Sequence, residues 1–323
     1  MKGEDGNDLK ITVSENVVRR DNNFYTVIDG LLEYNFDGEK VDINVSNVYI
    51  VNGNVDFKTG NIEFPGSIIV SGEIMSGFSV VSGENIIARV ISGDAKAGGN
   101  IIVKEGIIGS SIGKKNKIRA GGFIEANFIQ YADVTSDLYV KVKTMIRDSH
   151  IITDGKIIVD GHPGSVFGGT FYATKGLEAN SLGSPSFSKT KIVVGTSAKL
   201  ISNMMQVLQE KDSLERKLQQ IMNFLGIFEK KMDELDEEKR LKVNKLIHEK
   251  RQLRLKLFQL YAEIDEMKQE VKKGITSEII FKKDAMPGVI AVIGDYFFEL
   301  NSIVKKGKFC FDEPKKEVVI KNL

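Results

Sequence analysis

The chain has 323 residues, and its 45 lysine and arginine residues almost balance its 44 aspartate and glutamate residues, which leaves a formal net charge of +1. This balance argues against a globally basic nucleic-acid-binding protein and against an acidic disordered tail. The hydrophobic residues, 41% of the chain, suffice for a core, and a single cysteine, Cys310, excludes a disulfide framework and a zinc site built on several thiolates.

Residues 1–52 are expected to form an N-terminal β segment or cap. Short apolar runs at 11–13, 24–28, 41–45 and 48–51 predict strands, because Asn, Asp and Gly residues typical of turns separate them. The first ten residues lack the apolar stretch of a signal peptide, and no run of about 18 apolar residues follows anywhere, so we expect a cytoplasmic protein.

Residues 53–196 form a glycine-rich body that repeats itself. Of the 31 glycines, 22 lie between Gly53 and Gly195, and they alternate with apolar triplets that begin 14 to 23 residues apart. These triplets are Ile68-Ile69-Val70, Ile86-Ile87-Ala88, Ile101-Ile102-Val103, Ile124-Glu125-Ala126, Leu138-Tyr139-Val140, Ile157-Ile158-Val159, Leu177-Glu178-Ala179 and Ile192-Val193-Val194. A short strand and a glycine turn in every repeat predict a parallel β-helix, in which each coil buries its apolar face on the one before.

The middle residue of each triplet is expected to point outward, because side chains alternate along a strand. A row of outward aliphatic side chains would be an exposed apolar patch. One interpretation is that the N-terminal strands, the C-terminal tail or the helical insert cover the row. The other is that the row is an interface with a second copy or a partner, with the candidate self-association residues Ile69, Ile87, Ile102, Ile158 and Val193.

Residues 197–273 are predicted to form a helical insert. From Leu200, and again from Val243, apolar residues recur at alternating steps of four and three residues, which is the seam of a coiled coil. Two such helices joined near residues 233–239 predict an antiparallel coiled-coil hairpin, with Thr196 or Ser197 as its N-cap. Residues 274–323 are expected to return to the β-helix as a short C-terminal β segment.

The second predicted helix is basic along residues 239–256. One interpretation is a solvated face that pairs with acids of the first helix, and the other is a docking face for an acidic protein, an anionic lipid or a nucleic acid. The candidate partner-binding residues are Lys239, Arg240, Lys245, Lys250, Arg251 and Arg254. No aromatic residues alternate with these cations as they would on a platform that stacks bases.

Several segments resemble one bacterial family. These are Gly53-Asn54-Val55-Asp56-Phe57, Phe64-Pro65-Gly66, Ala97-Gly98-Gly99-Asn100-Ile101, Leu182-Gly183-Ser184-Pro185 and Met286-Pro287-Gly288-Val289. In this order, and with the coiled-coil insert before the last of them, they resemble the flagellar assembly protein A (FapA-like) family over about residues 10–315.

The resemblance implies a cytoplasmic, right-handed parallel β-helix with a protruding coiled-coil hairpin, linked to flagellar assembly or placement. No catalytic residues are established for the family, so none are carried over. Members usually have a larger N-terminal α/β domain, which is not expected in the fifty or so residues that precede the β-helix here.

Enzymatic alternatives are weaker. A carbohydrate-active β-helix would gather carboxylates on one face, whereas the aspartates here are scattered at positions typical of turns. His150 and His162 are candidates for a general base, but each has the surroundings of a structural residue. We therefore expect no catalytic, cofactor-binding or metal-binding residues, and no small-molecule substrate.

Taken together, the sequence predicts a mainly β protein with a helical insert that acts as a non-enzymatic scaffold. A homo-oligomer with protein partners, possible flagellar or polar proteins among them, is the main hypothesis. The alternatives are a carbohydrate-active enzyme or polysaccharide-binding module, and an adaptor that binds anionic lipid or nucleic acid through the basic helix.

Overall fold

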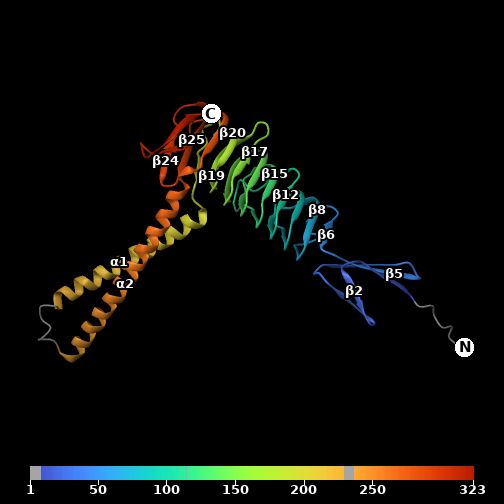
Figure 1. Cartoon of the computed structure of the whole chain (residues 1–323), viewed down its shortest axis with the longest axis horizontal. Helices are drawn as coiled ribbons and strands as arrows, with labels where there is room; N and C mark the ends of the chain where they lie inside the picture. Colours follow the sequence, from blue (N-terminus) through green and yellow to red (C-terminus); the bar gives the residue numbers. More distant parts are fainter. Residues whose placement is uncertain (1–8, 114, 229–235) are drawn as a thin grey trace.

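A computed structural model describes residues 9–113, 115–228 and 236–323. Small N-terminal sheets lie at one end of a long stack of β coils, and two helices project from the other end, where the C-terminal strands also lie (Figure 1). The chain is thus mainly β, with a parallel β solenoid and two helices.

The N-terminal sheets stand apart from the solenoid sheet. Strands β1 (Lys10–Val13), β5 (Lys40–Ser46) and β4 (Leu31–Phe36) form a three-stranded sheet in the order β1-β5-β4. Strands β2 (Val17–Arg20) and β3 (Asn23–Thr26) form an antiparallel hairpin.

Each coil of the solenoid adds a strand to three parallel stacks, and long strands bend so that they serve two of them. The first stack contains β6 (Val48–Val51), β8 (Ser67–Ile74), β10 (Ile86–Ile91), β12 (Ile101–Val103), β15 (Ile124–Gln130), β17 (Val140–Thr153), β18 (Ile157–Val159), β20 (Leu177–Leu182) and β22 (Ile279–Ala285). The second contains β13 (Gly106–Ile108), the start of β19 (Ser165–Ala173) and the later parts of β8, β10, β15, β17, β20 and β22. The third contains β7 (Ile62–Phe64), β9 (Ser79–Ser82), β11 (Asp94–Ala97), β14 (Lys117–Ala120), β16 (Asp133–Ser136), the ends of β17 and β19, β21 (Thr190–Val194) and β23 (Val289–Ile293).

The solenoid interior is a ladder of aliphatic side chains. In the first stack, Ile68, Ile86, Ile101 and Ile124 follow one another in register, and all four are fully buried. Every strand in the ladder repeats the predicted alternation of inward and outward residues. The predicted triplet at Leu138 is wrong, however: the strand that pairs with β15 begins two residues later, at Val140, and Leu138 is 56% exposed.

The solenoid begins earlier than expected. Strand β6, which the sequence analysis placed in the N-terminal segment, pairs in parallel with β8 and so belongs to the first coil. At the other end, β24 (Tyr296–Glu299), β25 (Val304–Asp312) and β26 (Glu317–Asn322) add antiparallel strands. Phe309 of β25 is fully buried against Phe281 of β22, with ring centroids 5.5 Å apart.

The two helices are inserted between β21 and β22, so they leave from and return to one end of the solenoid. Helix α1 (Ala198–Phe228) begins where the Leu200 N–H donates to the Ser197 hydroxyl over 3.1 Å, as the sequence predicts. Helix α2 (Glu237–Lys273) begins at Asp236, whose carboxylate accepts from the Lys239 N–H. Of the predicted turn at 233–239, residues 233–235 lie outside the described residues.

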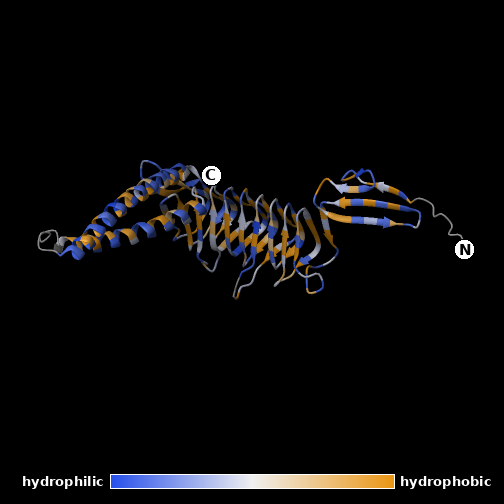
Figure 2. Cartoon of the chain, turned by 90° about the horizontal axis from the view of Figure 1, so that it is seen from below, coloured by the Kyte–Doolittle hydropathy of each residue, from blue (hydrophilic) through white to orange (hydrophobic). Residues whose placement is uncertain are grey.

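The hydropathy of the two parts differs. The helices are striped in hydrophilic and hydrophobic residues, whereas the solenoid strands contain hydrophobic runs (Figure 2). The buried residues of α2 all occupy positions of the predicted seam; they are Val243, Leu253, Leu257, Leu260, Ile264 and Val271.

Candidate functional site

The first candidate surface is a row of isoleucines on the outside of the first stack. Ile69 pairs in register with Ile87, and Ile87 pairs with Ile102, so the three side chains lie on neighbouring strands about 4.8 Å apart. All three are half-buried. Ile50 of β6 extends the row by one strand, and it is 58% exposed. We call Ile50, Ile69, Ile87 and Ile102 the isoleucine row.

Ile50 escaped the sequence analysis because its strand, Val48–Val51, carries no glycine turn before it. The signal that could have found it is the alternation of Tyr49, Ile50 and Val51, which matches the triplets that follow.

Charged residues separate Ile158 from this row. On the neighbouring strands of the first stack, Ile102 pairs with Glu125, Glu125 pairs with Lys141, and Lys141 pairs with Ile158. Lys141 forms an ion pair with Asp160 over 3.2 Å, and Glu125 accepts a hydrogen bond from the Tyr139 hydroxyl over 3.1 Å. Ile158 is half-buried but has Lys141 on one side and Glu178 on the other.

Val193 does not belong to the row. It lies in the third stack, where it pairs with Tyr172 and Val292, and it is only 3% exposed. The start of α1 faces this part of the stack, and Val193 lines a pocket there with Ile201 and Met204. Its assignment as an outward self-association residue is therefore wrong, because the helical insert covers it.

The second candidate surface is the pair of helices, which we call the arm. Lys256 of α2 pairs with Glu210 of α1 over 2.5 Å, and Glu249 of α2 pairs with Lys217 of α1 over 2.6 Å. Glu210 precedes Lys217 in α1, whereas its partner Lys256 follows Glu249 in α2. The two helices therefore run in opposite directions. Between them Leu225, Ile221, Val243 and Leu253 form a small apolar cluster.

The structure does not gather the six predicted basic residues on one face of α2. Arg251, Arg254 and Phe258 follow at three- and four-residue spacing and so share a face, whereas Lys245 lies six residues before Arg251, on another side. Lys239 forms an ion pair with Asp236 over 2.8 Å. Within the ranges that the structure describes, Arg251, Arg254 and Lys245 make no ion pair with a carboxylate, whereas Arg240 and Lys250 both have partners.

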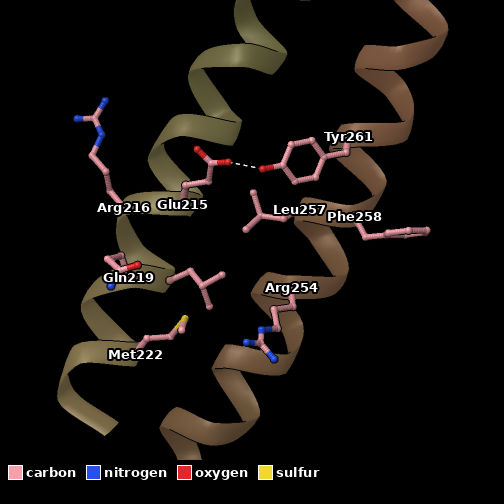
Figure 3. Close-up of a pocket in the computed structure, with 9 residues that line it drawn as sticks. Glu215, Arg216, Gln219, Met222, Arg254, Leu257, Phe258 and Tyr261 are labelled. Atoms are coloured by element: carbon pink, nitrogen blue, oxygen red, sulfur yellow. Dashed lines mark hydrogen bonds between the residues drawn. The ribbon is translucent and has the colours of Figure 1, made fainter. Parts of the chain in front are cut away.

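The face that carries Arg254 opens into a groove between the helices (Figure 3). Its volume is about 680 Å³, and it is lined by Glu215, Arg216, Leu218, Gln219 and Met222 of α1 and by Arg254, Leu257, Phe258 and Tyr261 of α2. Phe258 is 74% exposed beside it. Apolar side chains thus lie next to two arginines, an arrangement that can hold a partner with both apolar and acidic groups.

One end of the groove is closed by a hydrogen bond between the helices. The Tyr261 hydroxyl donates to the Glu215 carboxylate, and this bond, together with the negative charge of Glu215, raises the pKa of Tyr261 above its ordinary value. Sequence reasoning missed the groove because its walls come from two helices, whose relative rotation the seam alone does not specify.

Several residues weighed for enzymatic chemistry pair or pack with residues of neighbouring coils. His150 pairs in register with Asp133 and contacts Tyr172 edge to face at 5.7 Å, and burial lowers its pKa. Asp137 faces Arg119 at 3.9 Å and Asp160 pairs with Lys141. In the described ranges, no three His, Cys, Asp or Glu side chains are grouped so that they could hold a metal ion.

The profile of the Flagellar Assembly Protein A (FapA) beta solenoid domain matches residues 47–316. The chain belongs to this family. The match begins one residue before β6 and ends just before β26, so it spans the whole solenoid and the arm. No curated protein and no solved structure matches the chain. Among the described residues, neither helix of this FapA family member has an apolar stretch long enough to cross a membrane.

Proposed function

We propose that this FapA family member is a non-enzymatic cytoplasmic scaffold in flagellar assembly or cell-pole organisation. It associates with further copies through the isoleucine row and binds protein partners with the arm. The family supports a role in flagellar assembly. The single observation that supports the scaffold is the isoleucine row itself, a line of four stacked aliphatic side chains on the outside of a parallel sheet.

The row is suited to association because it is apolar, regular and carried by a stiff sheet. Burying apolar surface contributes about 25 cal/mol per Å² removed from water, so a line of isoleucines is unfavourable where it faces solvent. The interior ladder holds the strands that carry the row, so little backbone freedom is lost when a partner covers it. A second copy presents the same line of side chains, which allows a symmetric contact.

The arm is proposed to be an antiparallel coiled coil that reaches a protein partner. Its buried residues recur at the 3.5-residue period of the predicted seam, and the ion pairs between the helices flank this seam. Of the basic residues Lys239, Arg240, Lys245, Lys250, Arg251 and Arg254, we favour Arg251 and Arg254 as partner-binding. Arg254 lines the groove, Arg251 lies three residues before it on the same side of α2, and both lack acidic partners among the described residues. The right-handed sense of the β-helix stays a prediction from the family resemblance.

Light scattering of the purified chain over a range of concentrations tests the scaffold. We expect a dimer or larger assembly, and the triple variant Ile69→Lys/Ile87→Lys/Ile102→Lys should lower its mass at the same protein concentration. The matched control is Ile158→Lys, which changes the same residue type in the same column but beside Lys141 and Glu178; it should leave the mass unchanged. An assembly of unchanged mass in the triple variant would refute the role of the row.

The role of the arm is tested separately with Arg251→Glu/Arg254→Glu. If the partner is an acidic protein, wild-type chain should not sediment with phosphatidylserine vesicles or shift single-stranded DNA at moderate salt. Strong binding to either probe that salt weakens steeply and the charge reversal abolishes would contradict a protein partner. It would indicate instead that the arm binds a lipid or a nucleic acid.

A further inference from the structure

The three-stranded N-terminal sheet has one face that is entirely apolar. Residues that pair in register share a face of a sheet. Leu32, Tyr34 and Phe36 of β4 pair with Val45, Ile43 and Val41 of β5, and these last two pair with Val13 and Ile11 of β1. We call these eight residues the N-terminal apolar face: no charged or hydrogen-bonding group except the Tyr34 hydroxyl interrupts it.

The opposite face of the same sheet is polar except for Leu31, and its polar side chains pair with one another. The Asn44 amide donates to the Glu33 carboxylate over 2.9 Å, and Lys40 pairs with Asp42 over 2.6 Å. The two faces therefore differ as those of a sheet that packs on one side.

The N-terminal apolar face is nevertheless open to solvent. Tyr34 is 75% exposed, Leu32 61% and Phe36 55%. Val13, Val41 and Ile43 are half-buried. Val45 is buried, and the Asn16 side chain donates to its carbonyl over 3.0 Å. The solenoid lies beyond the end of the sheet (Figure 1).

A small sheet needs a packed apolar face to be stable in water. A covering layer is thus the arrangement that accounts for eight apolar residues on one side of this sheet.

We propose that a second copy of this chain covers the N-terminal apolar face, so that two three-stranded sheets pack face to face about 10 Å apart. A symmetric contact requires a surface that is complementary to itself, and an uncharged, evenly apolar sheet meets this requirement, since no like charges meet across it. The second copy matches it in strand length, width and twist.

The area of the face sets the strength of this contact. Three strands about 4.8 Å apart and five residues long, at about 3.4 Å each, cover only a few hundred Å². A stable dimer buries about 800 Å² on each partner. The contact is therefore reversible and concentration-dependent by itself, and it is independent of the isoleucine row, which lies on the solenoid.

The absence of tryptophan from the chain allows a local test. Tyr34→Trp places a unique fluorophore on the N-terminal apolar face, and the matched control Asn35→Trp places it on the opposite face of the same strand. As the concentration of the full chain rises, the emission of the first variant should shift to the blue because its ring leaves water, and the emission of the control should stay constant. A constant emission in both, or an equal shift in both, would overturn the proposal.

A pair of charge variants gives a second readout. Tyr34→Lys/Phe36→Lys and Leu31→Lys/Asn35→Lys each add two lysines to β4, on opposite faces. The first should weaken self-association measured by sedimentation velocity about tenfold or more, and the second should leave it unchanged. The blue shift of Tyr34→Trp should persist when Ile69, Ile87 and Ile102 are replaced by lysine. Loss of the shift in that background would show that the N-terminal sheets come together only when the isoleucine row associates, and would refute an independent contact.

Discussion

The solenoid and the arm bury their apolar residues in different ways. In the solenoid, each inward side chain touches the equivalent one in the coils before and after, so that Ile86, Ile101 and Ile124 are all fully buried. In the arm, burial is confined to one seam, and Leu255 and Phe258 on the same helix remain 60% and 74% exposed. The solenoid is therefore expected to be stiff and cooperative, whereas the arm is a marginal element whose outer surface is free to meet partners.

The largest expected effect compares two neighbouring residues of one strand. Ile101→Ala removes a rung of the interior ladder and leaves a cavity, so we expect a loss of about 2–5 kcal/mol in the free energy of unfolding. Ile102→Ala changes the adjacent outward residue of the isoleucine row and should cost about 1 kcal/mol or less in the monomer. Urea denaturation measures both, and equal losses would contradict the inward and outward alternation.

The root of the arm should be sensitive to a single methyl group. A Cβ at Gly274, where α2 ends, would lie 1.5 Å from the carbonyl oxygen of Gly195, which precedes α1. We expect Gly274→Ala to destabilise the junction by about 1–3 kcal/mol, seen as faster hydrogen exchange of both helices near the solenoid.

The control for this variant is Gly226→Ala, within α1. No atom lies within 4 Å of its Cβ position, so the substitution should stabilise the helix by about 0.5–1 kcal/mol through propensity alone. A stabilising Gly274→Ala would show that the two glycines do not meet at the junction.

The ion pair between Glu210 and Lys256 should contribute less. Both side chains are about half exposed, so solvent and salt screen the interaction. A double-mutant cycle with Glu210→Ala and Lys256→Ala, followed by thermal unfolding of the helices, should give a coupling below about 1 kcal/mol. A coupling of several kcal/mol would mean that charge, rather than the seam, holds the arm together.

The smallest effect concerns acid stability of the solenoid. Burial lowers the pKa of His150 below its ordinary value of 6.5, so the folded state favours the neutral imidazole. Its contribution is complete above pH 6.5 and is lost as the pH falls toward the folded-state pKa. In urea denaturation at different pH values, His150→Gln should reduce the fall in the free energy of unfolding below pH 6.5. An unchanged slope would refute the lowered pKa of His150.

The solenoid and the helices were predictable because both are built from local periodicity. The Ile-rich triplets specify inward and outward positions by themselves, and the step of four and three residues specifies the seam. The stack to which each strand belongs was not predictable in the same way. Val193 has the sequence of a first-stack triplet but lies in the third stack, because a triplet does not indicate on which side of the coil it lies.

The candidate surfaces were predictable only in part. Ile69, Ile87 and Ile102 follow from their triplets, but the strands that separate Ile158 from them depend on pairing across coils. The groove at Arg254 and Phe258 depends on how two helices rotate against each other. The N-terminal apolar face depends on the pairing of β5 with its neighbour β4 and with β1, which lies much earlier in the sequence.

Chemical crosslinking at the isoleucine row tests the central claim most directly. Cys310 is the only cysteine and is buried, so Ile87→Cys and Ile158→Cys in a Cys310→Ser background each give one accessible thiol. With a short bismaleimide, we predict crosslinked dimers for Ile87→Cys and monomers for Ile158→Cys at the same protein concentration. Equal yields, or a higher yield at Ile158→Cys, would contradict association through the row.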